Sequence, residues 1–297
     1  YLIDPSVESL LIAEKRFYDA LDDCKNPCKF SLIRSEFNSL PSEVDIAIIA
    51  THSSIRASVL CDIYEYSTPK NLILEKFLFD RIEDYKRVND LIELKKTSAW
   101  TNQWISSSYP FKRISDWFDD KTIKIHVYGE EWSLACNCIH FIDFFDYMNN
   151  YQDLNVVKSN LDSEVLPSKR KGYFEFTGSI CIDSSSGASI ILESKKGTFD
   201  GTINMRIENH KKACNIIIFG DKLVCAFECE EEKWTETFKL FFQSNTTNRI
   251  IQDILVNKSS LLPSYKRSSY QHKLVFPVFE NHLMNECGQT KRGCPIT

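Results

Sequence analysis

Residues 44–51 are Val44-Asp45-Ile46-Ala47-Ile48-Ile49-Ala50-Thr51, an almost continuous apolar run rich in β-branched side chains. Such a run is typical of a parallel strand that is covered on both faces. Apolar residues at helical spacing follow over 55–63, and Pro69 then precedes a second apolar run at 71–76. The order of strand, helix and strand predicts a doubly wound α/β domain.

The same alternation extends to both sides of this stretch. Residues 1–3 form a short apolar run that ends at Asp4 and Pro5, and apolar positions over 7–21 recur at the spacing of an amphipathic helix. Residues 82–94 also have a helical pattern. We therefore expect a Rossmann-like dinucleotide-binding domain over residues 1–120.

The pattern changes near residue 121, where a second domain over residues 121–297 is predicted. A strand is expected at 121–128 and an amphipathic helix at 137–148. Short strand-like runs separated by turn signals follow at 173–182, 189–194, 203–208, 213–219 and 222–227. Because no helical pattern interrupts them, they indicate a mostly antiparallel sheet in an α+β domain, with a late helix at 249–256.

Composition excludes several classes of protein. The 297 residues carry a net charge of -5, so no field of one sign is available to hold a phosphate backbone or an anionic membrane surface. No apolar stretch is long enough to cross a bilayer, and no secretory signal pattern opens the chain. We expect a cytoplasmic protein that binds neither nucleic acid nor membrane.

The 11 cysteines are scattered through a chain that is rich in apolar residues. We expect reduced and mostly buried thiols, because a core of this size needs no disulfides. Cys24 and Cys28, like Cys136 and Cys138, have no His or Cys cluster at zinc spacing. The sequence therefore predicts no metal site.

Three segments together carry a family resemblance, which covers nearly the whole chain. They are Asp45-Ile46-Ala47-Ile48-Ile49-Ala50-Thr51, Leu74-Glu75-Lys76 and Ile139-His140-Phe141-Ile142-Asp143. In order and spacing they resemble the Ala-Thr strand end, the Glu-Lys-Pro strand end and the His-containing helix of the Gfo/Idh/MocA oxidoreductases. Lys169-Arg170-Lys171-Gly172-Tyr173 and Cys294-Pro295-Ile296-Thr297 are similar to a bacterial branch associated with surface-polysaccharide sugars.

The resemblance implies NAD or NADP as cofactor and a sugar or nucleotide sugar as substrate. It implies cofactor contacts from Asp4, Ala50, Thr51, His52, Glu75 and Lys76. It also implies catalysis by Lys76 and His140, with Asp143 and His272 at the substrate. In proteins of this kind, an open sheet face of the second domain commonly becomes a contact between identical subunits.

The family pattern begins one strand earlier, with a Gly-rich turn that places the cofactor pyrophosphate at a helix N-terminus. This sequence has no such turn and no initiator Met, so we expect a chain that starts inside the cofactor domain. In this form, its dinucleotide binding and its activity are expected to be weak or absent.

Two strand-end residues have alternative interpretations. Asp4 could accept hydrogen bonds from an adenosine ribose, or it could cap the helix that begins near Pro5. Lys76 could contact cofactor and substrate and assist proton transfer, because burial readily lowers the pKa of a lysine. The alternative is a solvated lysine, and Phe77 stands where the family has Pro.

Three further positions also leave two interpretations open. His140 and Asp143 are three residues apart on a predicted helix, so the carboxylate could orient the imidazole. Many catalytic family members have Asp four residues before this His, whereas this chain has Cys136, so a catalytic and a structural histidine both stay open. His272 could approach the sugar or be structural, and the turn at 51–53 could pass close to the cofactor or cap a helix.

Two functions are therefore compatible with the sequence. The first is a sugar dehydrogenase or reductase in which Lys76 and His140 manage the hydroxyl proton. The second is a non-catalytic binding or assembly protein on the same fold, since a fold alone does not define function.

Overall fold

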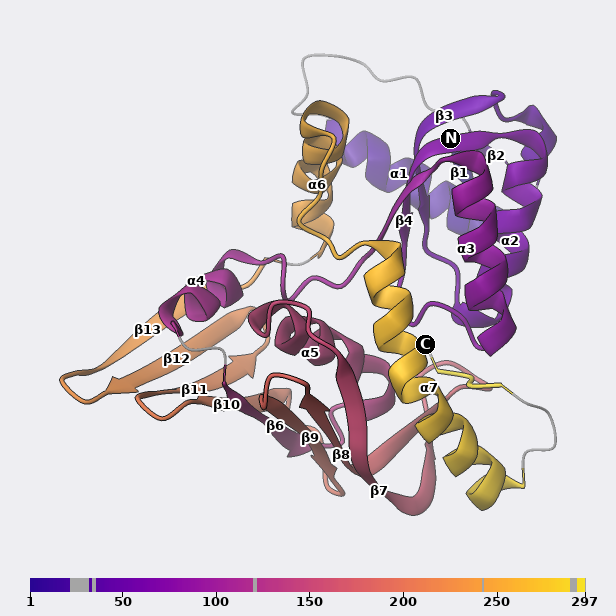
Figure 1. Ribbon diagram of the computed structural model, residues 1–297. Helices are drawn as coiled ribbons and strands as arrows, with labels where there is room; N and C mark the ends of the chain where they lie inside the picture. The colour runs from indigo at the N-terminus through magenta and orange to yellow at the C-terminus, as the bar shows by residue number, and fades with distance from the viewer. Residues whose placement is uncertain (22–31, 34–35, 120–121, 242, 289–292, 297) are drawn as a thin grey trace.

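The computed structural model describes residues 1–21, 32–33, 36–119, 122–241, 243–288 and 293–296 (Figure 1). Its first part alternates strands and helices. In chain order these elements are β1 (Leu2–Ile3), α1 (Val7–Leu21), β2 (Leu32–Ile33), η1 (Phe37–Ser39), β3 (Glu43–Ile49), α2 (Ser53–Tyr66), β4 (Thr68–Leu74), α3 (Ile82–Lys95) and β5 (Ser98–Thr101).

The strands β3, β4 and β5 form a parallel sheet with β4 in the centre, and β1 pairs in parallel with β2. Ile49 is in register with Leu74, which is in turn in register with Thr101. The carboxyl ends of the three strands therefore lie at one edge. Open α/β sheets bind ligands at this edge. The predicted α/β fold, with adjacent and parallel strands near 44–51 and 71–76, is confirmed.

The second part is built on an eight-stranded sheet with the order β13-β12-β11-β10-β6-β9-β8-β7. Every neighbouring pair is antiparallel except β6 and β9, which are parallel. This mostly antiparallel sheet was also predicted. In chain order, the elements of this second part are α4 (Tyr109–Trp117), β6 (Lys124–Glu130), α5 (Leu134–Met148), β7 (Leu154–Pro167), β8 (Phe174–Ser184), β9 (Ser189–Lys195), β10 (Thr202–Glu208), β11 (Lys212–Phe219), β12 (Lys222–Cys229), β13 (Lys233–Lys239), α6 (Gln243–Asn257) and α7 (Tyr265–Cys287).

Helix α5 is buried on almost every side, and its first turn contacts Lys76, which follows β4 of the small sheet. It packs against β8, β9 and α7, with most of its residues buried (Figure 1). The same buried cluster includes Ile49 and Leu74 of the small sheet and Ile190 and Leu192 of the large one. The hydrophobic core is thus continuous between the two sheets. The predicted boundary between domains 1–120 and 121–297 falls on residues 120 and 121, outside the described residues.

Several elements had no counterpart in the sequence prediction, and two show why. Strand β7 contains register shifts between Val156 and Lys158 and between Leu161 and Val165, which break the two-residue period of a strand. Helix α7 contains Pro277, a residue that normally argues against a helix interior. In both elements, packing against neighbours overrides the local signal.

Three of the sequence-based exclusions can be compared with the described residues. The cysteines placed by the structure are all free thiols, whereas Cys24 and Cys28 lie outside the described residues. Within the described ranges, no group of three or more His, Cys, Asp or Glu side chains could hold a metal ion. None of the helices in those ranges has the length and apolar character needed to span a membrane.

Candidate functional site

Lys76 joins the edge of the small sheet to the first turn of α5. It follows the last residue of β4 by two positions, and its side chain is half-buried. Its Nζ atom donates to the Sγ atom of Cys136 at 2.8 Å, to the carbonyl oxygen of Cys136 at 3.2 Å and to Oδ1 of Asn137 at 3.3 Å. The lysine is therefore engaged by the helix and is not a freely solvated strand-end residue.

A buried carboxylate on β8 meets the same helical turn. Glu175 accepts hydrogen bonds from the backbone amides of Ala135 at 2.9 Å and Cys136 at 3.3 Å. These amides lack intrahelical partners because they lie in the first turn of α5. Burial raises the pKa of Glu175 to about 7, and the backbone hydrogen bonds and Lys76 act in the opposite direction.

Glu175 was not among the site residues predicted from the sequence. The available signal was a lone acidic residue between Phe174 and Phe176 in a strand-like run. Its partners lie 39 or 40 residues away in sequence, so no local pattern could have revealed them.

His140 lies one turn further along α5 and is only 5% exposed. Its Nδ1 atom is buried without a hydrogen-bond partner among the residues described, and its ring lies 6.0 Å from that of Trp104. Burial, with smaller contributions from Lys76 and His272, lowers the pKa of His140 well below its usual value. The imidazole is therefore neutral at physiological pH.

Asp143 forms hydrogen bonds to groups other than His140. It accepts from the hydroxyl of Ser106 and, at 3.2 Å, from Nε2 of Gln271. Burial raises its pKa to about 7. The expectation that Asp143 orients the imidazole is wrong for this conformation, because no hydrogen bond between the two side chains is present in the described part of the chain. Gln271 comes from α7, far away in the sequence, and its hydrogen bond orients the carboxylate of Asp143 toward that helix.

His272, the second-domain candidate, lies on α7 and is fully buried. Its Nδ1 atom donates to the carbonyl oxygen of Ser268 at 2.7 Å, and its ring meets Phe77 edge-on at 4.7 Å. Burial lowers its pKa to about 3. Its Nε2 atom has no partner among the described groups. His272 therefore packs against Phe77, the residue that follows Lys76 in the sequence.

The expected cofactor residues lie at the ends of parallel strands. Asp4 accepts from the backbone amide of Ser6 at 2.7 Å, and the hydroxyl of Ser6 in turn caps α1 by accepting from the amide of Ser9 at 3.1 Å. Ala50 is exposed directly after β3. Glu75 follows β4 and accepts a hydrogen bond from Asn102, which follows β5. His52 lies at the start of α2, where Nδ1 contacts the hydroxyl of Tyr173 at 2.6 Å.

A buried arginine ties two of the strand ends together. The guanidinium of Arg56 donates to the carbonyl oxygens of Thr51, Phe77 and Leu78, the last at 2.6 Å. Burial lowers the pKa of Arg56 to about 10, so it remains charged at neutral pH. The turns that carry Thr51 and Lys76 are thereby held side by side.

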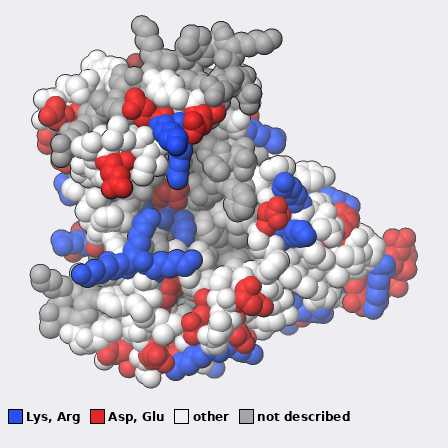
Figure 2. All heavy atoms as spheres, turned by 180° about the vertical axis from the view of Figure 1, so that it is seen from behind, with Lys and Arg blue, Asp and Glu red and all other residues white. Residues whose placement is uncertain are grey.

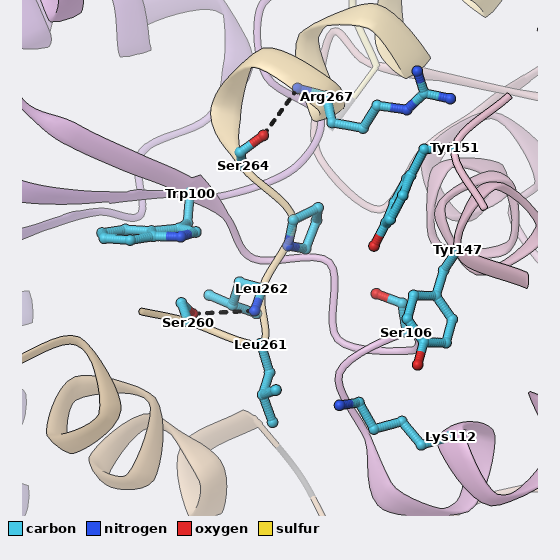
Figure 3. Close-up of a pocket in the computed structure, with 11 residues that line it drawn as sticks. Trp100, Ser106, Lys112, Tyr147, Tyr151, Ser260, Leu261, Leu262, Ser264 and Arg267 are labelled. Carbon is cyan, nitrogen blue, oxygen red and sulfur yellow. Dashed lines mark hydrogen bonds between the residues drawn. The ribbon is translucent and has the colours of Figure 1, made fainter. Parts of the chain in front are cut away.

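Thr51 and Lys76 thus share one edge of the sheet, and Lys76 contacts the helix that carries His140. The Oγ1 atom of Thr51 is buried without a partner among the described residues, and this orphaned hydroxyl fits a polar group of a ligand at the strand ends. Seen from behind, Lys and Arg side chains gather at a hollow between the α/β part and the large sheet (Figure 2). The pocket in Figure 3 lies elsewhere and is not lined by any of these three residues.

Comparison with known proteins finds similarity at the level of structure. No protein-family profile matches the sequence, and no curated relative matches it. Among solved structures, a super-repressor mutant of Gal80p from Saccharomyces cerevisiae aligns with a TM-score of 0.68 and 15% identity, covering 96% of this chain and 87% of that one. The 3-ketoreductase KijD10 from Actinomadura kijaniata, in complex with TDP-benzene and NADP, aligns with a TM-score of 0.64 and 12% identity, covering 92% and 85%.

A third solved structure, the UDP-N-acetylglucosamine 3-dehydrogenase GnnA from Acidithiobacillus ferrooxidans, aligns with a TM-score of 0.60 and 10% identity, covering 89% of this chain and 85% of that one. These structural neighbours are of the Gfo/Idh/MocA type. The chain therefore has the two-part fold of these solved structures, as the resemblance implied. At these identities the likeness defines the fold and leaves the reaction to be argued from the site.

Proposed function

We propose that this chain is an NAD- or NADP-dependent oxidoreductase that acts on a hydroxyl or carbonyl group of a sugar or nucleotide sugar. The observation that carries the proposal is the contact of Lys76 with the first turn of α5, the helix on which His140 holds a neutral imidazole one turn later. A cation and a proton acceptor near one strand edge suit the conversion of an alcohol to a carbonyl.

Each residue has a defined part in the proposed chemistry. A bound nicotinamide would exchange a hydride with the substrate carbon. The neutral imidazole of His140 would accept the hydroxyl proton, and the ammonium group of Lys76 would stabilise negative charge that develops on the oxygen. Thr51, with its unpartnered hydroxyl, and the exposed backbone at Ala50 would contact the cofactor.

Each of the two parts of the chain, one built on the small sheet and one on the large sheet, has its own role in the proposal. Residues 1–120 would hold the cofactor, and residues 121–297 would shape the substrate site and provide a contact between identical subunits. We place the protein in the cytoplasm and its substrate among the sugars of surface polysaccharides. The 3-ketoreductase KijD10, solved with NADP, and the UDP-N-acetylglucosamine 3-dehydrogenase GnnA support the proposed cofactor and the nucleotide-sugar class of substrate.

The first test titrates the full chain with NADH and with NADPH and measures binding by the change in cofactor fluorescence. We expect at least one of the two cofactors to bind at the carboxyl ends of β3 and β4, where the unpartnered hydroxyl of Thr51 lies. Nucleotide sugars should then support hydride transfer. The substitution Lys76→Ala should lower this rate by a factor on the order of 10²–10⁴ and leave cofactor binding measurable.

The matched control is Lys70→Ala, which removes an exposed lysine from β4 that pairs with Glu43 and Asp45. It should leave the rate within about twofold of the unmodified chain. Absence of a fluorescence change at millimolar cofactor, or equal rates for Lys76→Ala and the unmodified chain, would contradict the proposal.

A second candidate is a non-catalytic binding protein, and Cys136 is the observation that favours it. Burial raises the pKa of this thiol, so the group that contacts Lys76 is a neutral thiol and not a carboxylate. Gal80p from Kluyveromyces lactis, described as a transcriptional regulator, shares the fold with a TM-score of 0.66 and 15% identity, covering 96% of this chain and 84% of that one. Cofactor binding without turnover of any nucleotide sugar would support this candidate.

A further inference from the structure

A cavity of about 440 Å³ lies where β5, α4, α5 and the segment before α7 meet (Figure 3). This volume is within the range of small-molecule sites. One wall is Trp100 of β5 with residues 260–264, and the opposite wall is Tyr147 and Tyr151 at the end of α5. Neither Lys76 nor His140 lines this cavity, so it is separate from the candidate oxidoreductase site.

The walls are fixed by contacts outside the cavity. Segment 260–264 is anchored on β5, because the amide of Thr101 donates to the carbonyl oxygen of Pro263 at 3.0 Å and Trp100 forms a β-bridge with Ser264. Trp100 also packs against the small apolar cluster that contains Leu262 and Ile254. The cavity is therefore largely formed before any ligand arrives.

The hydroxyl groups in the cavity suit a ligand that carries hydroxyls of its own. The phenol oxygens of Tyr147 and Tyr151 and the hydroxyl of Ser106 point into the space (Figure 3). Burial raises the pKa of Tyr147 above its usual value and that of Tyr151 to about 12, so both phenols stay protonated at neutral pH. Ser106 donates to Asp143, which leaves its oxygen available as an acceptor.

The charges in the cavity favour an anion. Arg267 lines the wall, but its charge is matched by a bidentate contact with buried Asp146. The side chain of Lys112 of α4 also points toward the cavity, and its ammonium group has neither a hydrogen bond nor an ion pair within the described part of the structure (Figure 3). Asp116 contributes to the raised pKa of Tyr147, but no ion pair joins it to Lys112 among those groups. An unpaired ammonium group is a suitable partner for a phosphate or carboxylate.

We propose that this cavity binds a small anionic sugar, a hydroxyl-bearing ring with one phosphate or carboxylate group. The ring would lie between the aromatic side chains of Trp100 and Tyr151, whose apolar faces suit the C–H face of a sugar. Tyr147 and Ser106 would meet its hydroxyls, and Lys112 would bind its anionic group.

Isothermal titration calorimetry of the full chain tests the proposal with four probes: glucose 6-phosphate, glucuronate, glucose and inorganic phosphate. Glucose 6-phosphate or glucuronate should bind at least tenfold more tightly than glucose or inorganic phosphate, and the difference between the first two identifies the anionic group. Lys112→Met should weaken binding of the tighter of these two probes by roughly tenfold or more, because a charge-assisted hydrogen bond is lost.

Two control variants assign the binding to this cavity. Lys95→Met removes an exposed lysine near the end of α3 and should leave the affinity unchanged. Lys76→Ala should also leave it unchanged, because Lys76 belongs to the other site. Absence of binding by all four probes would overturn the proposal. So would unaltered binding by a folded Lys112→Met variant, or loss of binding in Lys76→Ala with retention in Lys112→Met.

Discussion

At the scale of single residues, burial has made His140 and His272 unlike ordinary histidines. Both rings are almost inaccessible, and burial lowers the pKa of each below its usual value. For His140 this produces a neutral imidazole on the helix that Lys76 contacts. For His272, which packs on Phe77 and donates to Ser268, it produces a neutral side chain whose protonation destabilises the folded state.

The substitution His272→Gln should therefore change the pH dependence of stability. The folded-state pKa of His272, about 3, lies below the unfolded value near 6.5, so the unfolded chain takes up a proton first as the pH falls. Between about pH 7.5 and pH 5, the unmodified chain should lose about 2 kcal/mol of unfolding free energy relative to the variant. Urea unfolding at several pH values measures the difference. Parallel stability curves for the two proteins would contradict the expectation.

At the scale of elements, the start of α5 depends on a residue from the large sheet. Glu175 of β8 accepts from the first amides of the helix, and Lys76 contacts the same turn from the small sheet. These two contacts therefore fix the first turn of α5 relative to both sheets, next to the candidate site. Loss of the carboxylate leaves these buried amides without an acceptor.

Glu175→Ala should accordingly lower the unfolding free energy by about 1–2 kcal/mol, the usual effect of losing such a cap. Glu175→Gln keeps an acceptor oxygen and should cost less. Because burial raises the pKa of Glu175 to about 7, the glutamine also avoids the cost of the buried charge above that pH. Denaturant unfolding at about pH 8 compares the two, with the exposed Glu164→Ala as control. Equal losses for alanine and glutamine would show that the acceptor oxygen is unimportant.

At the scale of the whole molecule, residues 293–296 connect parts that are far apart in sequence. The amide of Cys294 donates to the carbonyl oxygen of Asp80 at 2.6 Å, and the amide of Phe174 donates to that of Pro295 at 3.1 Å. The hydroxyl of Ser53 donates to the carbonyl oxygen of Ile296 at 2.6 Å. This segment therefore links the loop before α3, the start of α2 and the start of β8.

The substitution Ile296→Ala should lower the unfolding free energy by about 2–4 kcal/mol, since this side chain is fully buried and truncation leaves a cavity. Leu255→Ala, which truncates a side chain that is 39% exposed, is the control and should cost much less. Thermal and urea unfolding measure both. If Ile296→Ala costs no more than the control, the segment does not contribute to holding the parts together.

The sequence by itself determined the strands and helices whose side-chain periodicity is strong. The apolar runs at 44–51 and 71–76 predicted two buried strands, and their order with the helices predicted parallel neighbours. That order in turn placed Thr51 and Lys76 at one sheet edge. These features were readable because they depend on short segments and on general rules for parallel sheets.

Only the tertiary structure decided how the site residues are partnered. Asp143 lies three residues from His140, yet it bonds to Ser106 and Gln271. Lys76 meets Cys136, and Glu175 caps the turn on which that cysteine lies. Such partners belong to elements that are far apart in the sequence and pack together only in the folded protein. Local periodicity records which face of a segment is apolar and carries no information about which distant polar group will meet it.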